Sequence, residues 1–244
     1  MDDKVTVAAL QQMKRDARKI AGVVAWDYQI AQIAERAGVD LVSVGDSVGA
    51  NLWGQPTETE VTMEELLVVC KAVRRGVKRV LLSCDVPYGP AQEGAAASVN
   101  AARRLAGEGG ADMVKIKGDA GAVRAIVRAG IPVFAEFHGD GRAANELVEE
   151  AKRLEEAGAS LLDFRNSGPV AGAAVVSAVS IPVIGGLGGG PWLDGRVRLA
   201  HTAIGYGAKW IDSTTDTYAN TARLSLEAFT ALVSDVRSGR QIKG

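Results

Sequence analysis

The sequence predicts a single-domain α/β protein, a (βα)8 TIM barrel that spans residues 1–244. Its length is close to the ~250 residues that such a barrel needs, and the chain has 244. Short apolar runs recur along it, each preceded by a helical pattern, at the spacing of βα repeats. No Pro- or Ser-rich linker divides the sequence, which indicates one domain.

Each repeat has the same local order. A helical pattern ends, in most repeats at a glycine that can adopt a left-handed conformation, and an apolar run suited to a buried parallel strand follows. Eight such runs are expected to be strands: residues 22–27, 37–46, 75–85, 109–119, 129–139, 157–166, 180–188 and 207–213. Between them, a capping box predicts a helix that begins after Thr62 and runs to about Arg75. The remaining helices are expected at residues 94–108, 120–129, 142–157, 169–179 and 219–237.

An open doubly wound sheet would also alternate strands with helices. That fold binds dinucleotides through a GxGxxG motif after its first strand, and none occurs there. The glycine-rich stretch at residues 185–190 lies near the seventh strand instead, where barrels often bind phosphate or another anion through backbone N–H groups. The closed barrel is therefore favoured.

Composition excludes several classes of protein. The chain has 28 Lys+Arg and 29 Asp+Glu, so it offers no basic surface for nucleic acid and no polybasic patch for a membrane. No apolar run approaches the ~20 residues of a membrane helix, and the N-terminus is acidic rather than signal-like. Cys70 and Cys84 form neither a CxxC pair nor a disulfide framework, which favours a reducing cytoplasm. We therefore expect a soluble cytoplasmic enzyme.

Polar residues gather where the predicted strands end. In a barrel these ends meet at one mouth, and charges there are costly unless they are paired or bound to a ligand. The residues are Asp27, Asp46, Ser47, Asp85, Lys115, Lys117, Glu136, His138, Asp163, Arg165 and Asp212. Of these, Asp27 and Asp212 are expected to be structural.

Asp46 and Asp85, at the ends of adjacent strands, suit Mg²⁺, which takes hard oxygen ligands and often only one or two protein carboxylates. Alternatively, each aspartate caps a helix or pairs with Lys115 or Lys117. The two lysines share a strand face, so they could hold a substrate anion, or one could form a Schiff base. His138 at the mouth could move protons, whereas His201 is expected to be structural.

Four segments together resemble one family. They are VSVGDSVGANLWGQPTETEVTMEELLVVCKAVRRG (42–76), LLSCDVPYG (81–89), ADMVKIKGD (111–119) and IPVIGGLGGGPWLDGRVRLAH (181–201). In order and spacing they resemble the ketopantoate hydroxymethyltransferases, barrels of the phosphoenolpyruvate/pyruvate superfamily. The resemblance extends over nearly the whole chain, from about Val24 to Arg237.

The resemblance implies an aldol-type transfer of a hydroxymethyl group to a 2-oxo acid. The acid binds Mg²⁺, a base removes its C3 proton, and the enolate attacks the one-carbon unit of methylene-tetrahydrofolate. By the same resemblance Asp46 and Asp85 hold the metal, Ser47 and Lys115 contact the substrate, and the enzyme is a large homo-oligomer.

Three positions depart from the family pattern, and the segment after His138 is shorter than in the family. Lys117 replaces a glutamate near the metal, Glu136 replaces a histidine at the substrate, and Arg165 stands at or next to the glutamate that acts as base. Glu136 could supply the carboxylate lost at 117. We expect Glu136 or His138 to remove the proton and Arg165 to bind a second anionic group.

The candidate catalytic residues are therefore Glu136, His138 and Lys117. Two alternatives keep the barrel and change the chemistry: a lyase or mutase of the same superfamily, or a Schiff-base aldolase that acts through Lys117. A third is a non-catalytic barrel that binds small acids.

Overall fold

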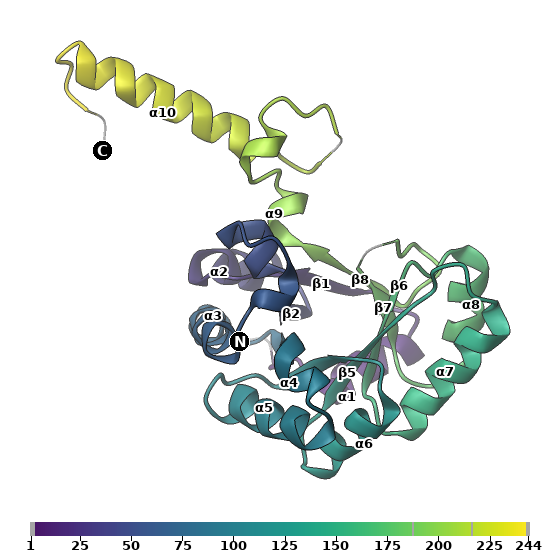
Figure 1. Cartoon of the computed structure of the whole chain (residues 1–244). Helices are drawn as coiled ribbons and strands as arrows, with labels where there is room; N and C mark the ends of the chain where they lie inside the picture. Colours follow the sequence, from purple (N-terminus) through teal and green to yellow (C-terminus); the bar gives the residue numbers. More distant parts are fainter. Residues whose placement is uncertain (1–2, 187, 216, 243–244) are drawn as a thin grey trace. The chain divides into compact units, whose positions relative to one another are not determined.

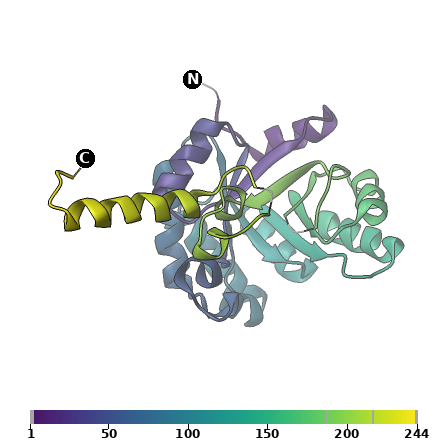
Figure 2. The same ribbon diagram turned by 90° about the horizontal axis from the view of Figure 1, so that it is seen from above.

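Eight parallel strands form a closed barrel in sequential order, as the sequence predicts (Figures 1 and 2). The computed structural model describes residues 3–186, 188–215 and 217–242. The strands are β1 (Ile20–Val24), β2 (Leu41–Val44), β3 (Leu81–Asp85), β4 (Met113–Lys117), β5 (Val133–His138), β6 (Leu161–Arg165), β7 (Val183–Gly185) and β8 (Gly195–Leu199).

Helices precede or follow these strands in the chain. They are α1 (Val7–Arg15), α2 (Tyr28–Ala37), α3 (Met63–Gly76), α4 (Tyr88–Gln92), α5 (Ala95–Gly107), α6 (Ala120–Arg128), α7 (Ala144–Glu156) and α8 (Pro169–Ala178), then α9 (Ala200–Ala203) and α10 (Thr221–Arg237). The predicted capping box is present, because Thr62 and Glu65 each accept a hydrogen bond from the other's backbone N–H. Asp27 has the expected structural role: its carboxylate accepts from Ile30 N at 2.9 Å and caps α2.

The predicted eighth strand at residues 207–213 is wrong. That segment contains a 3-10 helix, Ala208–Trp210, and β8 lies earlier, at Gly195–Leu199. The strand was missed because Arg196 and Arg198 are exposed and interrupt its apolar pattern. Gly195 is required by close packing, since a Cβ there would lie 2.2 Å from the carbonyl oxygen of Ile20 on β1.

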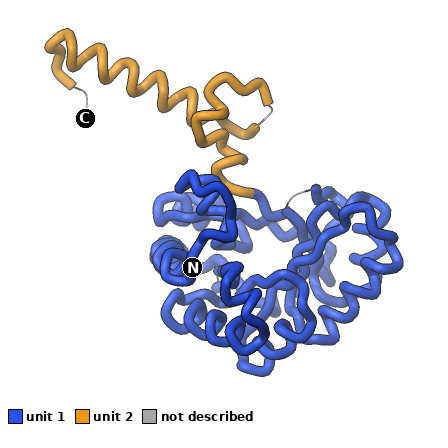
Figure 3. Tube along the Cα trace, viewed as in Figure 1, with its two compact units in different colours: residues 1–198 blue, residues 199–244 orange. Residues whose placement is uncertain are grey.

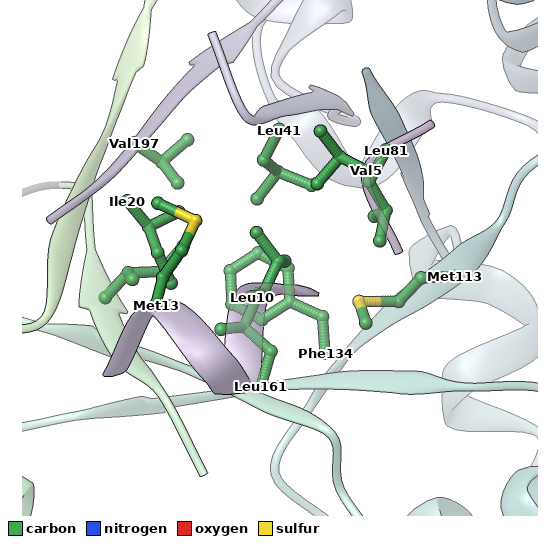
Figure 4. Packing of buried hydrophobic residues seen from close by; sticks show 11 residues of the cluster. Val5, Leu10, Met13, Ile20, Leu41, Leu81, Met113, Phe134, Leu161 and Val197 are labelled. Carbon is green, nitrogen blue, oxygen red and sulfur yellow. The ribbon is translucent and has the colours of Figure 1, made fainter. Parts of the chain in front are cut away.

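One end of the barrel is closed by α1. Leu10 and Met13 of this helix pack among apolar side chains from the strands, with Leu41, Leu81 and Phe134 among them (Figure 4). Burial of this cluster stabilises the barrel at about 25 cal/mol per Å² of apolar area removed from water. Apolar side chains fill this end of the barrel, so the polar residues lie at the opposite ends of the strands.

The chain forms two compact units, residues 1–198 and 199–244 (Figure 3). The first holds seven complete strands and most of β8, and the second holds α9, the 3-10 helix and α10. The single domain predicted over residues 1–244 stays a prediction. Among the described residues, no helix has the length and hydropathy to span a bilayer.

Candidate active site

Strand register brings the predicted charged residues of β3 to β6 together at the carboxyl ends of these strands. Asp85 on β3 lies beside Lys115 on β4, and Lys117 lies beside Glu136 on β5. Glu136 in turn lies beside Asp163 on β6, and His138 beside Arg165. Because side chains alternate along a strand, Lys115, Glu136, Asp163 and their neighbours two residues on share faces, as the sequence indicates.

The Lys115 ammonium lies among these carboxylates. It pairs with Glu136 Oε2, and it lies 3.0 Å from Asp163 Oδ2. Burial alone would lower the pKa of Lys115, but the carboxylates of Asp85, Asp163 and Glu136 raise it well above its usual value. Lys115 is therefore a fixed positive charge.

Glu136 is surrounded by donors. Its Oε1 atom lies 2.9 Å from His138 Nε2 and 3.2 Å from Arg165 Nη1, while Oε2 contacts Lys115. Burial opposes ionisation of this carboxyl, but Lys115 and Arg165 outweigh it and hold the pKa of Glu136 well below its ordinary value. Both oxygens thus have partners, which leaves Glu136 a weak base and does not support it as the replacement for the carboxylate lost at 117.

Asp85 is in the opposite situation. Its Oδ1 atom is buried and has no hydrogen-bond partner among the described residues. Burial, together with the negative charges of Asp46, Glu136 and Asp163, raises the pKa of Asp85 to about 8, and Lys115 only partly opposes this. The positive charge of Lys115 therefore offsets only part of the cost of ionising this carboxyl.

Asp46 and Ser47 follow β2 and lie near Asp85. Burial and the charge of Glu58 raise the pKa of Asp46, while Lys115 and Lys117 oppose the shift. Gly45 permits the close approach: a Cβ there would lie 2.9 Å from Ser47 Oγ and 3.4 Å from Asp85 Oδ2. In the described part of the chain, neither aspartate caps a helix or forms an ion pair with a lysine.

A divalent cation fits these two aspartates. It would provide a partner for the buried Oδ1 atom of Asp85, and carboxylate oxygens are the ligands that Mg²⁺ prefers. Within the described ranges, no group of three or more His, Cys, Asp or Glu side chains could hold a metal. At such a site these two aspartates would supply two carboxylates and leave further positions for water and substrate oxygens.

The other predicted residues differ in exposure. Lys117 is exposed, so it lacks the desolvation that a Schiff-base lysine usually needs. The side chains of Arg165 and His138 are 28% and 36% exposed, which leaves both accessible beside the buried Glu136. His201 lies in the second unit, where burial, together with the charge of Lys209, lowers its pKa to about 4.

Four residues near this site have no catalytic, substrate-binding or metal-binding role in the sequence prediction. Asp163 is among the predicted strand-end residues and shares a strand face with Arg165, but no role is assigned to it. Glu58, whose charge affects Asp46 and Arg165, lies in a 3-10 helix with no such pattern. Asp140 and Asn166, in the turns after β5 and β6, hydrogen-bond each other at 2.7 Å.

The glycine-rich stretch contributes at least one backbone donor to the site. Gly186 N–H donates to Asp163 Oδ1 at 3.3 Å, so a protein carboxylate occupies this donor. Leu187 in the same stretch lies outside the described residues. Anion binding at residues 185–190 stays a prediction.

The closed parallel barrel, with charged groups at the carboxyl ends of its strands, defines the chain as a (βα)8-barrel enzyme. Two solved structures share this fold across most of their length. Phosphonopyruvate hydrolase in complex with oxalate and Mg²⁺ matches with a TM-score of 0.64 at 17% identity, covering 96% of this chain and 88% of that one. A 2,3-dimethylmalate lyase of the PEP mutase/isocitrate lyase superfamily matches with a TM-score of 0.65 at 14% identity, covering 96% and 86%.

Sequence comparison shows the family. The ketopantoate hydroxymethyltransferase model matches residues 4–241. The 3-methyl-2-oxobutanoate hydroxymethyltransferase of Salinibacter ruber is 34% identical and covers 96% of this chain and 95% of its own. That of Cyanothece sp. is also 34% identical, covering 96% and 97%. The chain belongs to the ketopantoate hydroxymethyltransferase family, transferases of one-carbon groups.

The burial of Asp85 predicts a pH dependence of stability. In metal-free protein the folded state keeps a proton on Asp85 up to about pH 8, whereas the unfolded chain loses it near 3.8. This contribution to the free energy of unfolding therefore falls as pH rises through that window. Asp85→Asn removes the ionisable group, so we expect the variant to gain stability relative to wild type as pH rises.

Thermal unfolding of both proteins in chelator, at several pH values between 4 and 8, measures this difference. If the two stability curves run parallel across the window, Asp85 does not carry the shifted proton.

Proposed function

We propose that this enzyme forms a C–C bond at the carbon next to the keto group of a 2-oxo acid, in a reaction that depends on a divalent metal. The proposed substrate is 3-methyl-2-oxobutanoate, after which the relatives are named. Methylene-tetrahydrofolate is the proposed one-carbon donor. The observation that carries the proposal is the buried Asp85 carboxylate, with an unpartnered oxygen, close to Asp46 in a chain of this family.

Asp46 and Asp85 would hold Mg²⁺. The bound ion supplies a Lewis acid that stabilises negative charge on the keto oxygen as the C3 proton leaves. Ser47 lies beside this pair, where its hydroxyl would bind the substrate. Lys115 is a fixed cation in the same site, and its charge would attract the substrate carboxylate.

His138 is the better candidate for the base. Glu136 is held ionised by Lys115 and Arg165, and a carboxylate with so low an affinity for protons removes them poorly. His138 is partly exposed at the mouth, where its imidazole can reach a bound substrate. Lys117 would act at most through its charge near Asp46.

Loss of C3 proton exchange tests the function. Wild-type protein with Mg²⁺ is expected to exchange the C3 proton of 3-methyl-2-oxobutanoate into heavy water, as followed by NMR. Asp85→Ala should reduce the rate by at least about 100-fold, the scale of a lost metal or general-base contribution. The exposed Asp212→Ala is the matched control and should exchange at the wild-type rate.

Absence of exchange in wild type with any of a panel of 2-oxo acids and divalent metals would contradict the proposal and favour the non-catalytic barrel. Borohydride treatment with substrate separates the Schiff-base alternative, since a covalent adduct at Lys117 is incompatible with the metal scheme.

Arg165 is proposed to bind an anionic group of the substrate. Its guanidinium uses one nitrogen on Glu136 and is partly exposed. Arg165→Met should raise KM for the substrate about 10- to 100-fold, since a charged hydrogen bond contributes about 1.5–3 kcal/mol. Arg196→Met, at an exposed position of β8, is the control. A change in kcat alone would refute the binding role.

We further propose a cytoplasmic homo-oligomer. Both cysteines are free and buried, which suits a reducing compartment.

On α10, Leu224, Phe229 and Val236 are 62%, 65% and 56% exposed, a costly exposure that contact with another copy would remove. Phe229→Glu should lower the molar mass measured by light scattering, whereas Glu227→Gln should not; equal masses for all three proteins would contradict this contact.

A further inference from the structure

The turns that follow β5 and β6 hold a hydrogen-bonded pair of residues with an uncommon backbone. Asp140 has φ of 27° and Asn166 has φ of 51°, both in the left-handed region that non-glycine residues seldom adopt. Asn166 Nδ2 donates to Asp140 Oδ1 at 2.7 Å. Such conformations persist only where the surroundings hold them, and they cluster at functional sites. The pair therefore fixes the Asp140 carboxylate in place.

The backbone between the two turns is closely packed. Gly139 N–H donates to Arg165 O at 2.9 Å, and a Cβ on Gly139 would lie 2.2 Å from Asn166 O. Only glycine fits at this position. Gly139 lies between His138 and Asp140 in the chain. Its close packing therefore also holds the backbone of Asp140 next to His138.

The second oxygen of Asp140 faces the candidate base. Asp140 Oδ2 lies 3.3 Å from His138 Nδ1, while His138 Nε2 lies 2.9 Å from Glu136 Oε1. The imidazole thus has a carboxylate at each ring nitrogen. The hydrogen bond at one nitrogen of a histidine decides which nitrogen exchanges protons, as in other Asp–His pairs.

We propose that Asp140, held by Asn166, is a positioning residue for His138. Asp140 accepts the Nδ1 proton in the loaded enzyme, so the neutral imidazole has its lone pair on Nε2, which exchanges its contact with Glu136 for the substrate. The C3–H bond breaks, its electron pair enters the enolate, and the proton stays on Nε2. This inference rests on the proposed function.

The remaining charged groups near the ring act elsewhere. Arg165 and Lys115 contact Glu136 rather than the imidazole, and Arg142 Nη1 donates to the backbone oxygen of His138 at 3.4 Å. Asp140 is therefore the group positioned to orient the Nδ1 side of His138.

Exchanging the residues at positions 140 and 166 distinguishes a positioning role of Asp140 from a purely structural one. The Asp140 carboxylate provides two acceptor oxygens, one toward Asn166 and one toward His138, whereas asparagine provides one. Asp140→Asn should lower kcat and the C3 exchange rate about 10- to 100-fold with little change in KM, the range for loss of a histidine's carboxylate partner. Asn166→Asp should do the same, because it places two carboxylates together.

The double variant Asp140→Asn/Asn166→Asp restores a donor opposite an acceptor and should recover part of the lost activity. In a His138→Gln background, Asp140→Asn should have no further effect, because its contribution passes through the ring. Asp119→Asn, in the turn after β4, is the matched control and should match wild type. An Asp140→Asn loss of equal size with and without His138 would overturn the proposal.

A spectroscopic measurement tests the positioning without activity. The chain has two histidines, so ¹⁵N-histidine NMR of wild type, with the His138 signals identified by their loss in His138→Gln, reports its Nδ1 and Nε2 separately. Asp140→Asn should shift the Nδ1 resonance and leave His201 unchanged. An unmoved Nδ1 resonance overturns the inference whatever the activity. An inactive wild type with the expected shift instead contradicts only the proposed function.

Discussion

The buried ammonium of Lys115 is the charge on which the arrangement of the site depends. From β4 it reaches a carboxylate on β5 and another on β6, and its field extends to Asp85 on β3. Removing such a cation from water is costly, and only several nearby negative charges offset that cost. Lys115 therefore stabilises the ionised carboxylates of Glu136 and Asp163, which both have it as a partner. Asp85 is left outside these pairs, and its environment is the one that a further cation would complete.

Two of the departures from the family pattern are physically coupled. The acid at position 136 and the base-type residue at position 165 lie on neighbouring strands, with Glu136 Oε1 3.2 Å from Arg165 Nη1. Arg165 without Glu136 would lose its ion-pair partner, whereas Glu136 without Arg165 would still pair with Lys115. The third departure, Lys117, lies apart from this pair. It is exposed, and its charge acts on Asp46. The resemblance places the family's base at the end of β6, where this chain has Arg165, so the proton transfer proposed here uses another residue.

Much of this site could be predicted from the sequence because the physics involved is local or periodic. Buried parallel strands appear as apolar runs, and alternation alone places Glu136 with His138 and Asp163 with Arg165. The failures have identifiable causes. β8 carries exposed Arg196 and Arg198 and therefore lacks the apolar run. The contact between Asp140 and Asn166 joins two turns 26 residues apart, and only the register of β5 with β6 brings them together. Likewise, the two Glu136 oxygens are contacted by side chains from three strands, and only the folded barrel brings these together.

The charge balance of the mouth connects metal and substrate. Four carboxylates, those of Asp46, Asp85, Glu136 and Asp163, share this end of the barrel with the fixed cations of Lys115 and Arg165. A 2-oxo acid adds another negative charge, and the same low-dielectric surroundings that raise the pKa of Asp85 oppose it. The divalent cation proposed for Asp46 and Asp85 would reverse this balance, because it would neutralise both carboxylates. Electrostatics therefore favours binding of the cation before, or together with, the anionic substrate. The residues at 136 and 165 carry one charge of each sign in this chain and pair with each other, so they leave this coupling intact.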